Sequence, residues 1–283
     1  MKSIPVVNGR GEAEEVEIDS EPRRWDPSIL YDDDYKVCYL RSEYNAKIPW
    51  YMVPNELVIA PIDNLDDETV LFDNATYNAS FLMKENGMYY AFVSINEKVI
   101  YECMHQVIWI YKSPSLDKKF EKVREIKPHK LSPKHNMAGF RDAYIFKEDR
   151  YYMFVTTGGL KYWEMPPAIS LYASDTIDGE YEFLHEAFMD EHFLRFGELE
   201  RPCIVKKGDI YFLTFSCWGK YRNPVESNDA SYQMFVAQSD DITKPFKYNM
   251  KINMNGYAWQ HLDGHSVAWR WTNNGSGTRI VIK

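Results

Sequence analysis

The chain has 283 residues, of which 45% are hydrophobic and 16% aromatic, so it is long enough for one large β domain with an extensive core. Its formal net charge of -9 argues against nucleic acid as a partner, because phosphate groups require a basic surface. No stretch approaches the roughly 18 uninterrupted apolar residues of a membrane span, and residues 1–20 lack the apolar run of a signal peptide. We therefore expect a cytoplasmic protein that does not associate with membranes.

The cysteines indicate the same location. None of the four has CxxC spacing, and two of them lie inside apolar runs. We expect buried free thiols, which are typical of a reducing compartment. The four residues are Cys38, Cys103, Cys203 and Cys217.

In chain order, one unit recurs five times with changes. A polar residue heads an apolar strand, which is followed by a charged turn and an aromatic strand. Aligning the apolar strands puts five residues in register: Asp26, Asn78, Asp142, Arg201 and His265. The steps between them are 52, 64, 59 and 64 residues, a spacing that suits four-stranded propeller blades with long loops.

The later strands of each unit recur as well. Apolar third strands at 107–111, 168–173 and 233–237 are each followed by a turn rich in Ser, Pro or Asp. The sequence therefore predicts an all-β fold, a five-bladed β-propeller, with residues 1–283 forming a single catalytic domain. The fifth unit is short, and we expect the N-terminal segment 1–20 to supply its missing outer strand and close the ring.

The candidate catalytic residues lie at the starts of the first strands of the units. The first strand of a blade lies nearest the propeller axis, so residues at its start should surround one mouth of the central channel. Asp26, Asp142 and Glu200 would then face one another there. Cleavage of a glycosidic bond uses such a set, with one carboxyl protonated as the acid and another ionised as nucleophile or base.

Three motifs at these positions resemble the signatures of the levansucrase family of five-bladed propeller glycosidases. They are Trp25-Asp26, Arg141-Asp142 and Glu198-Leu199-Glu200-Arg201-Pro202. That family is related to the invertases and, more distantly, to the β-xylosidase and α-arabinofuranosidase families. The sequence departs from the family pattern at Ala143, where the family has Pro, and in its Trp-Asp-Pro first motif. The Trp-Asp-Pro motif is closer to the corresponding motif of the invertase and arabinofuranosidase relatives.

The resemblance implies a role for each matched residue. Asp26 would be the nucleophile, Glu200 the general acid/base, and Asp142 the acid that hydrogen-bonds sugar hydroxyls and stabilises the transition state. Substrate-binding roles are implied for five further residues. Arg141 and Arg201 would fix hydroxyls and hold the carboxylates, Glu198 would line the next subsite, Trp25 would form a sugar platform, and His265 would face the substrate from the fifth blade.

The resulting hypothesis is a retaining glycoside hydrolase or transglycosidase that acts on a furanoside through a covalent furanosyl-enzyme. A β-fructofuranoside such as sucrose is the first expectation. One alternative is an inverting hydrolase similar to arabinofuranosidases and xylosidases. Another is a propeller that binds carbohydrate without catalysis. A small carbohydrate is the expected partner in each case, and the oligomeric state is open.

A spaced set of ligand-type residues occurs near the C-terminus. His261, Asp263 and His265 alternate, so a single strand would present all three on one face, which resembles a metal-ligand spacing. An ordinary polar strand at the channel mouth is the simpler interpretation, and we expect no cofactor. The resemblance to arabinan-degrading relatives implies a calcium or sodium ion near His265 as the alternative.

Overall fold

The computed structural model describes most of the strands and the tight turns between them. The described residues are 14–16, 23–42, 54–75, 77–100, 103–129, 139–158, 167–191, 193, 199–218, 232–252, 257–262, 265–271 and 278–282. This part of the chain is all-β, as the sequence predicts. No helix within it is long and apolar enough to cross a membrane.

The strands form five four-stranded antiparallel sheets. The first contains β2 (Arg23–Asp32), β3 (Asp34–Ser42), β4 (Asn55–Pro61) and β5 (Thr69–Ala75). The second contains β6 (Tyr77–Glu85), β7 (Met88–Ile100), β8 (Cys103–Ser113) and β9 (Glu121–Ile126). The third contains β10 (Phe140–Lys147), β11 (Tyr151–Thr157), β12 (Ala168–Ser174) and β13 (Glu182–Met189). The fourth contains β14 (Leu199–Lys207), β15 (Ile210–Trp218), β16 (Tyr232–Ser239) and β17 (Lys247–Ile252). The last contains β18 (Tyr257–Leu262), β19 (His265–Trp271), β20 (Thr278–Ile282) and β1 (Glu14–Val16).

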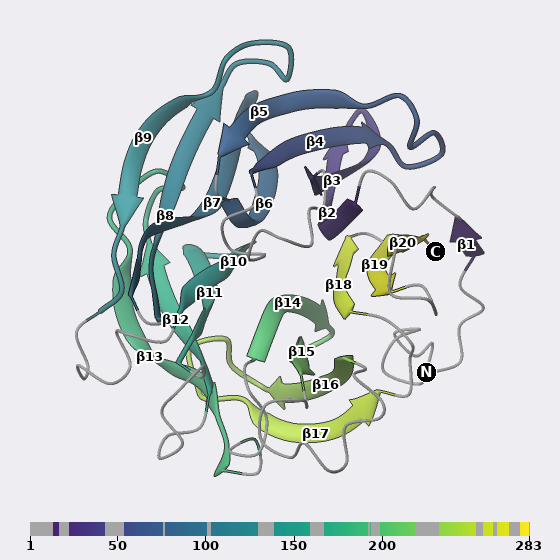
Figure 1. The fold of residues 1–283 in the computed structure, drawn as a ribbon. Helices are drawn as coiled ribbons and strands as arrows, with labels where there is room; N and C mark the ends of the chain where they lie inside the picture. Colours follow the sequence, from purple (N-terminus) through teal and green to yellow (C-terminus); the bar gives the residue numbers. More distant parts are fainter. Residues whose placement is uncertain are drawn as a thin grey trace.

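The sheets lie around a central axis, with one strand of each nearest the centre (Figure 1). These inner strands contact one another in the cyclic order β2, β6, β10, β14, β18 and back to β2. The arrangement confirms the predicted β-propeller. The two ends of the chain meet in one sheet, where β1 pairs with β20 through Glu14 and Ile282. The N-terminal segment therefore supplies an outer strand, as predicted, and covers an edge that would otherwise be open.

The five inner strands share one irregularity. In each inner strand, two consecutive residues lie opposite a single residue of the second strand, which is a β-bulge. The bulge falls at the same level in every sheet. The bulged pairs are Asp26-Pro27, Asn78-Ala79, Asp142-Ala143, Arg201-Pro202 and Ala258-Trp259. The predicted register is thus confirmed for the first four units.

The alignment of the fifth unit is wrong. Its inner strand is β18, so Ala258 occupies the position equivalent to Asp26, and His265 begins the second strand β19 opposite Leu262. The apolar pattern after His265 belongs to a second strand, and periodicity alone does not distinguish a second strand from a first.

The aromatic residues serve mainly as core. Phe193, which is fully buried, lies with its ring centroid 5.5 Å from Phe188, 5.5 Å from Phe215 and 4.9 Å from Phe235. Edge-to-face packing of this kind adds to the free energy gained by burying the rings. The predicted buried free thiols are confirmed for Cys38, Cys203 and Cys217; the side chain of Cys103 lies outside the described residues.

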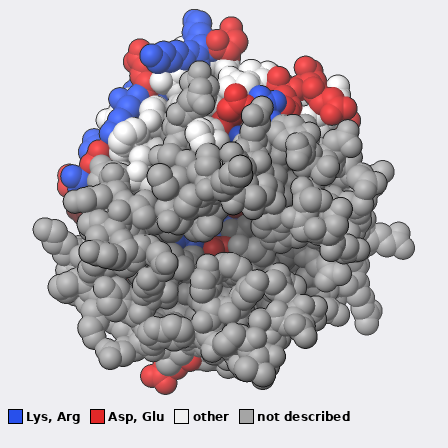
Figure 2. All heavy atoms as spheres, in the orientation of Figure 1, with Lys and Arg blue, Asp and Glu red and all other residues white. Residues whose placement is uncertain are grey.

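Ion pairs join neighbouring sheets at the end of the channel away from the bulges. Lys84 pairs with Asp32 at 2.5 Å and Lys147 pairs with Glu85 at 2.5 Å, each lysine reaching the preceding sheet. Lys206 makes the same contact with Glu148. On the face shown in Figure 2, the described lysines, arginines and acids are interspersed over the first two sheets.

Candidate active site

Asp26 lies in the bulge of β2 with a left-handed backbone, at φ 52°. The residue as a whole is half-buried, and the pKa of its carboxyl is raised from an ordinary 3.8 to about 7. Burial is the largest cause, and the neighbouring Asp142 and Glu200 raise the pKa further, whereas Arg201 and Arg141 lower it. These mutual effects place the three acids in one electrostatic neighbourhood.

Asp142 occupies the equivalent bulge of β10, also left-handed at φ 59°, and is buried. Its carboxylate Oδ2 accepts a hydrogen bond of 2.9 Å from the backbone N–H of Arg201. Its other oxygen, Oδ1, lies 3.8 Å from Nε of Arg141. The backbone N–H of Asp142 donates to Oγ of Ser94 at 3.1 Å. Both the charge and the main chain of Asp142 are therefore held by residues of neighbouring sheets.

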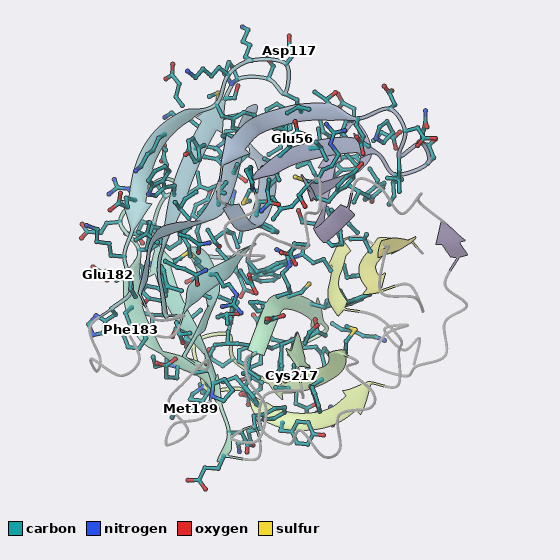
Figure 3. All side chains as sticks on the ribbon, in the orientation of Figure 1. Glu56, Asp117, Glu182, Phe183, Met189 and Cys217 are labelled. Atoms are coloured by element: carbon teal, nitrogen blue, oxygen red, sulfur yellow. The ribbon has the colours of Figure 1, made fainter. Side chains whose placement is uncertain are left out.

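Glu200 directly precedes the bulge of β14 and is buried. Its Oε1 accepts a hydrogen bond of 3.0 Å from Nη2 of Arg141, which makes a charge-assisted pair. The thiol of Cys217, labelled in Figure 3, is buried in the neighbouring strand β15. Burial raises the pKa of this thiol, and the charge of Glu200 raises it further. The thiol is therefore a neutral neighbour of the candidate acid.

Arg141 bridges the two acids on β10 and β14. It is buried, contacts Asp142 through Nε and Glu200 through Nη2, and so fixes the distance between their sheets. Gly139 makes room for this guanidinium, since a Cβ at that residue would lie 3.0 Å from Nη1 of Arg141. The backbone of Gly139 has φ 125°, which glycine adopts readily.

Arg201 is almost fully buried, and its side chain reaches the main chain of β2 at Asp26. Its guanidinium donates to three main-chain carbonyls, those of Asp26 at 3.2 Å, Pro27 at 2.7 Å and Ser80 at 3.2 Å. A buried cation needs such acceptors to offset its lost hydration. Arg201 therefore holds the main chain that carries Asp26, while a direct contact of Arg201 with sugar stays a prediction.

Three further site residues predicted from the sequence lie wholly or partly outside the described residues. Trp25 and His265 lie on described strands, but their side chains are outside the described residues, and Glu198 lies outside them altogether. Their substrate-binding roles stay predictions. The backbone position of His265 separates it from the acids. It begins β19 and pairs with Leu262, at the end of β18 that is farthest from the bulge.

The expected set of alternating ligands is not on one strand. The chain turns between His261 and His265, whose strands β18 and β19 are antiparallel, and Asp263 lies outside the described residues. The ring of His261 stacks on Trp259 with centroids 5.5 Å apart, a packing role. No cluster of three His, Cys, Asp or Glu side chains suited to a metal ion occurs among the residues described. An ion near His265 stays a prediction.

A cavity of about 510 Å³ occupies the channel beyond the bulges. It is lined by the later residues of all the inner strands, including Tyr31, Lys84 and Lys206, and by none of the three acids. Because strands rise about 3.3 Å per residue, it lies toward the ends of the inner strands that carry Lys84 and Lys206, away from the bulges. In the view of Figure 2, charged atoms of both signs are visible at the bottom of the central opening.

Fold and site together define an all-β propeller whose inner strands present three carboxyls and two arginines at one level. No known family model matches the chain. A segment is 30% identical over 93 residues to the extracellular exo-α-(1→5)-L-arabinofuranosidase of Cellvibrio japonicus, covering 29% of this chain and 25% of that protein.

Solved structures share the fold along nearly the whole chain. A GH43 β-xylosidase/α-arabinofuranosidase from a compost metagenome, in complex with xylotriose, is 15% identical with a TM-score of 0.64, covering 96% of this chain and 94% of that one. A GH43_1 enzyme from Xanthomonas citri complexed with xylotriose is 12% identical with a TM-score of 0.64, covering 96% and 90%. A GH32 β-fructofuranosidase from Bombyx mori in complex with sucrose is 16% identical with a TM-score of 0.63, covering 93% and 59%. At such identities these likenesses establish the fold alone.

Proposed function

We propose that this protein is a glycoside hydrolase that cleaves furanosides at the level of the inner-strand bulges. The observation that carries the proposal is the grouping of Asp26, Asp142 and Glu200 around Arg141 and Arg201. Grouping carboxyls at close range has an electrostatic cost, which the two arginines offset. A cluster of acids in which one carboxyl has a raised pKa, as Asp26 has, is typical of glycosidases.

We infer that Asp26 is the carboxylate that acts at the anomeric carbon. In a retaining enzyme it attacks that carbon, and the C–O bond to the leaving group breaks as Glu200 delivers a proton to the leaving oxygen. Water then hydrolyses the furanosyl ester with Glu200 as base. In an inverting enzyme Asp26 instead removes a proton from the attacking water. A pKa near 7 would suit a base at neutral pH.

Asp142 would bind a sugar hydroxyl through Oδ1, the oxygen that does not accept the N–H of Arg201. One of its oxygens is already committed to the N–H of Arg201, so its orientation is fixed before substrate arrives. Preorganised charge of this kind stabilises a positively charged, oxocarbenium-like transition state without a reorganisation cost at the moment of reaction.

An α-L-arabinofuranoside is the sugar that we propose first. Support comes from the 30% identity to the Cellvibrio japonicus arabinofuranosidase and from the Trp-Asp-Pro motif at Trp25-Asp26-Pro27. A β-fructofuranoside is the second candidate, supported by the motif at Glu200-Arg201-Pro202 and by the fold shared with the sucrose-bound GH32 enzyme. The five sheets would act as five blades of one catalytic domain.

The test is a panel of aryl α-L-arabinofuranoside, aryl β-D-xyloside, aryl β-D-fructofuranoside and sucrose, with the anomeric configuration of the first product read by NMR. We expect turnover of a furanoside, with Asp26→Asn and Glu200→Gln as inactive or impaired controls of unchanged fold. Binding of sugars without turnover of any substrate would favour the carbohydrate-binding alternative and overturn the enzymatic proposal.

A further inference from the structure

Two residues of the second sheet, Ser94 and Gln106, hydrogen-bond to the main chain of β10, the strand of the third sheet that carries Arg141 and Asp142, and neither belongs to a motif of the sequence. They are at the base of the β7–β8 hairpin. The pairing of β6 with β7 ends at Tyr77 and Ile95, but β7 and β8 continue to pair as far as Ile100 and Cys103. The hairpin therefore extends past the level of the bulges, and its base lies at that level.

Ser94 is the residue of β7 that faces the bulge of its own sheet. The equivalent residues of the other sheets are Tyr39, Val155, Phe215 and Ala268, so a small hydroxyl here departs from the core pattern. Ser94 is 1% exposed, and its hydroxyl accepts the N–H of Asp142 in the next sheet. The bulge removes Asp142 from the β-ladder, so the hydroxyl supplies an acceptor that the sheet does not.

Gln106 binds the main chain at the residue that precedes Arg141. Its Oε1 accepts the N–H of Phe140 at 3.1 Å, and its Nε2 donates to Oδ1 of Asn96 at 2.8 Å. The amide is thus fixed at both ends across the hairpin. A Cβ on Gly139 would lie 3.4 Å from Oε1 of Gln106 and 3.0 Å from Nη1 of Arg141, so the amide and the guanidinium flank the same glycine.

These contacts belong to a polar circuit that passes around the axis. Ser94 accepts from Asp142, Asp142 accepts from the N–H of Arg201, and Arg201 donates to the carbonyls of Asp26 and Ser80. Ser80 and Ser94 belong to the same sheet, so the circuit returns to the sheet where it began. A displacement at Ser94 would therefore be transmitted to the carboxylates.

We infer that Ser94 and Gln106 are positioning residues that fix Asp142 and Arg141 for the reaction, an inference that rests on the proposed function. Removing the hydroxyl of Ser94 leaves the N–H of Asp142 without its acceptor, and removing the amide of Gln106 does the same to Phe140. A misplacement of about 1 Å in a catalytic group can cost about 100-fold in rate. We expect Ser94→Ala and Gln106→Met to lower kcat at least about 10-fold with KM changed less than about 3-fold.

The experiment compares these variants with Ser94→Thr, which keeps the hydroxyl, and with Ser170→Ala as the matched control. Ser170 is also a buried strand serine, hydrogen-bonded to Thr157 and Glu186, but it belongs to the third strand of its sheet. Melting temperatures establish that all variants fold. Kinetics use the aryl furanoside that the wild type turns over fastest.

A second measurement requires no turnover. The titration of the Asp26 carboxyl is followed by ¹³C NMR and assigned with Asp26→Asn; the charged groups that face it are Arg141 and Asp142 of β10 and Glu200 and Arg201 of β14. We expect Ser94→Ala and Gln106→Met to move this titration by at least about 0.5 unit, and Ser170→Ala and Ser94→Thr to leave it in place. An unmoved titration in Ser94→Ala and Gln106→Met would overturn the inference. An inactive wild type would overturn the proposed function, and the titration would still decide the positioning role.

Discussion

Arg201→Met tests whether one buried cation holds the site together. The substitution keeps most of the side-chain volume but removes the donor of three hydrogen bonds to the carbonyls of Asp26, Pro27 and Ser80. Leaving a buried acceptor unsatisfied costs about 1–3 kcal/mol. Removing a buried charge returns several kcal/mol of desolvation energy. At about 1–3 kcal/mol for each of the three acceptors, the total cost exceeds that return, and we expect a net loss of about 2–4 kcal/mol in the free energy of unfolding, or about 4–8 °C in Tm for a chain of this size.

The same variant should also change the pH dependence of activity. The positive charge of Arg201 lowers the pKa of Asp26, so its removal should raise that pKa and shift the acidic limb of kcat/KM to higher pH. Scanning calorimetry and pH-rate profiles measure the two effects. Arg150→Met is the control, because Arg150 pairs at 2.6 Å with Asp175, an acid that is 83% exposed, and such pairs contribute at most about 1 kcal/mol. An Arg201→Met protein with the Tm and acidic limb of the wild type would refute the reasoning.

The remaining predictions concern the three acids. Asp26 must be ionised to act, so kcat/KM of the wild type should rise with pH through about 7; a limb near pH 4 would contradict the buried environment. Because this native pKa lies above the ordinary 3.8, the native state binds the extra proton, and the contribution of Asp26 to stability falls as pH rises from about 4 to 7. Asp26→Asn should therefore raise Tm more at pH 8 than at pH 5, and an equal change at both would count against it. Glu200→Gln should slow poor leaving groups more than activated aryl groups, since activated groups need less protonation; equal slowing would remove the acid role from Glu200. Asp142→Asn should lower kcat about 100-fold with a smaller effect on KM, and a near-normal kcat would reduce Asp142 to a strand cap.

The sequence predicts where along the inner strands the site lies, because each unit repeats the same local pattern, a polar residue at the start of an apolar strand. Asp26, Asn78, Asp142 and Arg201 each start an apolar strand, and each falls in the same bulge. The prediction fails at the fifth unit, where Ala258 is the bulge residue and gives no polar signal. The alternation around His265 is equally typical of the second strand to which it belongs.

The contacts to the main chains that carry the acids could not be predicted from the sequence. Ser94 and Gln106 act across a boundary between sheets, so their partners lie 48 and 34 residues away, and no local pattern marks them. The one available signal is a serine where the other units have larger or purely apolar side chains, and it is visible only once the bulges are aligned. The carbonyl partners of Arg201 depend on the direction of main chains 121 to 175 residues away. The raised pKa of Asp26 likewise depends on burial that residue identity does not give.

The central claim is that Asp26, Asp142 and Glu200 form one catalytic site for furanoside cleavage. The most direct measurement is kcat/KM of the wild type, Asp26→Asn, Asp142→Asn and Glu200→Gln on the aryl furanoside with the fastest wild-type turnover, with circular dichroism to confirm folding. The account predicts a loss of at least about 100-fold for Asp26→Asn and Asp142→Asn, and for Glu200→Gln once the leaving group is a poor one. Wild-type rates in all three folded variants would contradict it.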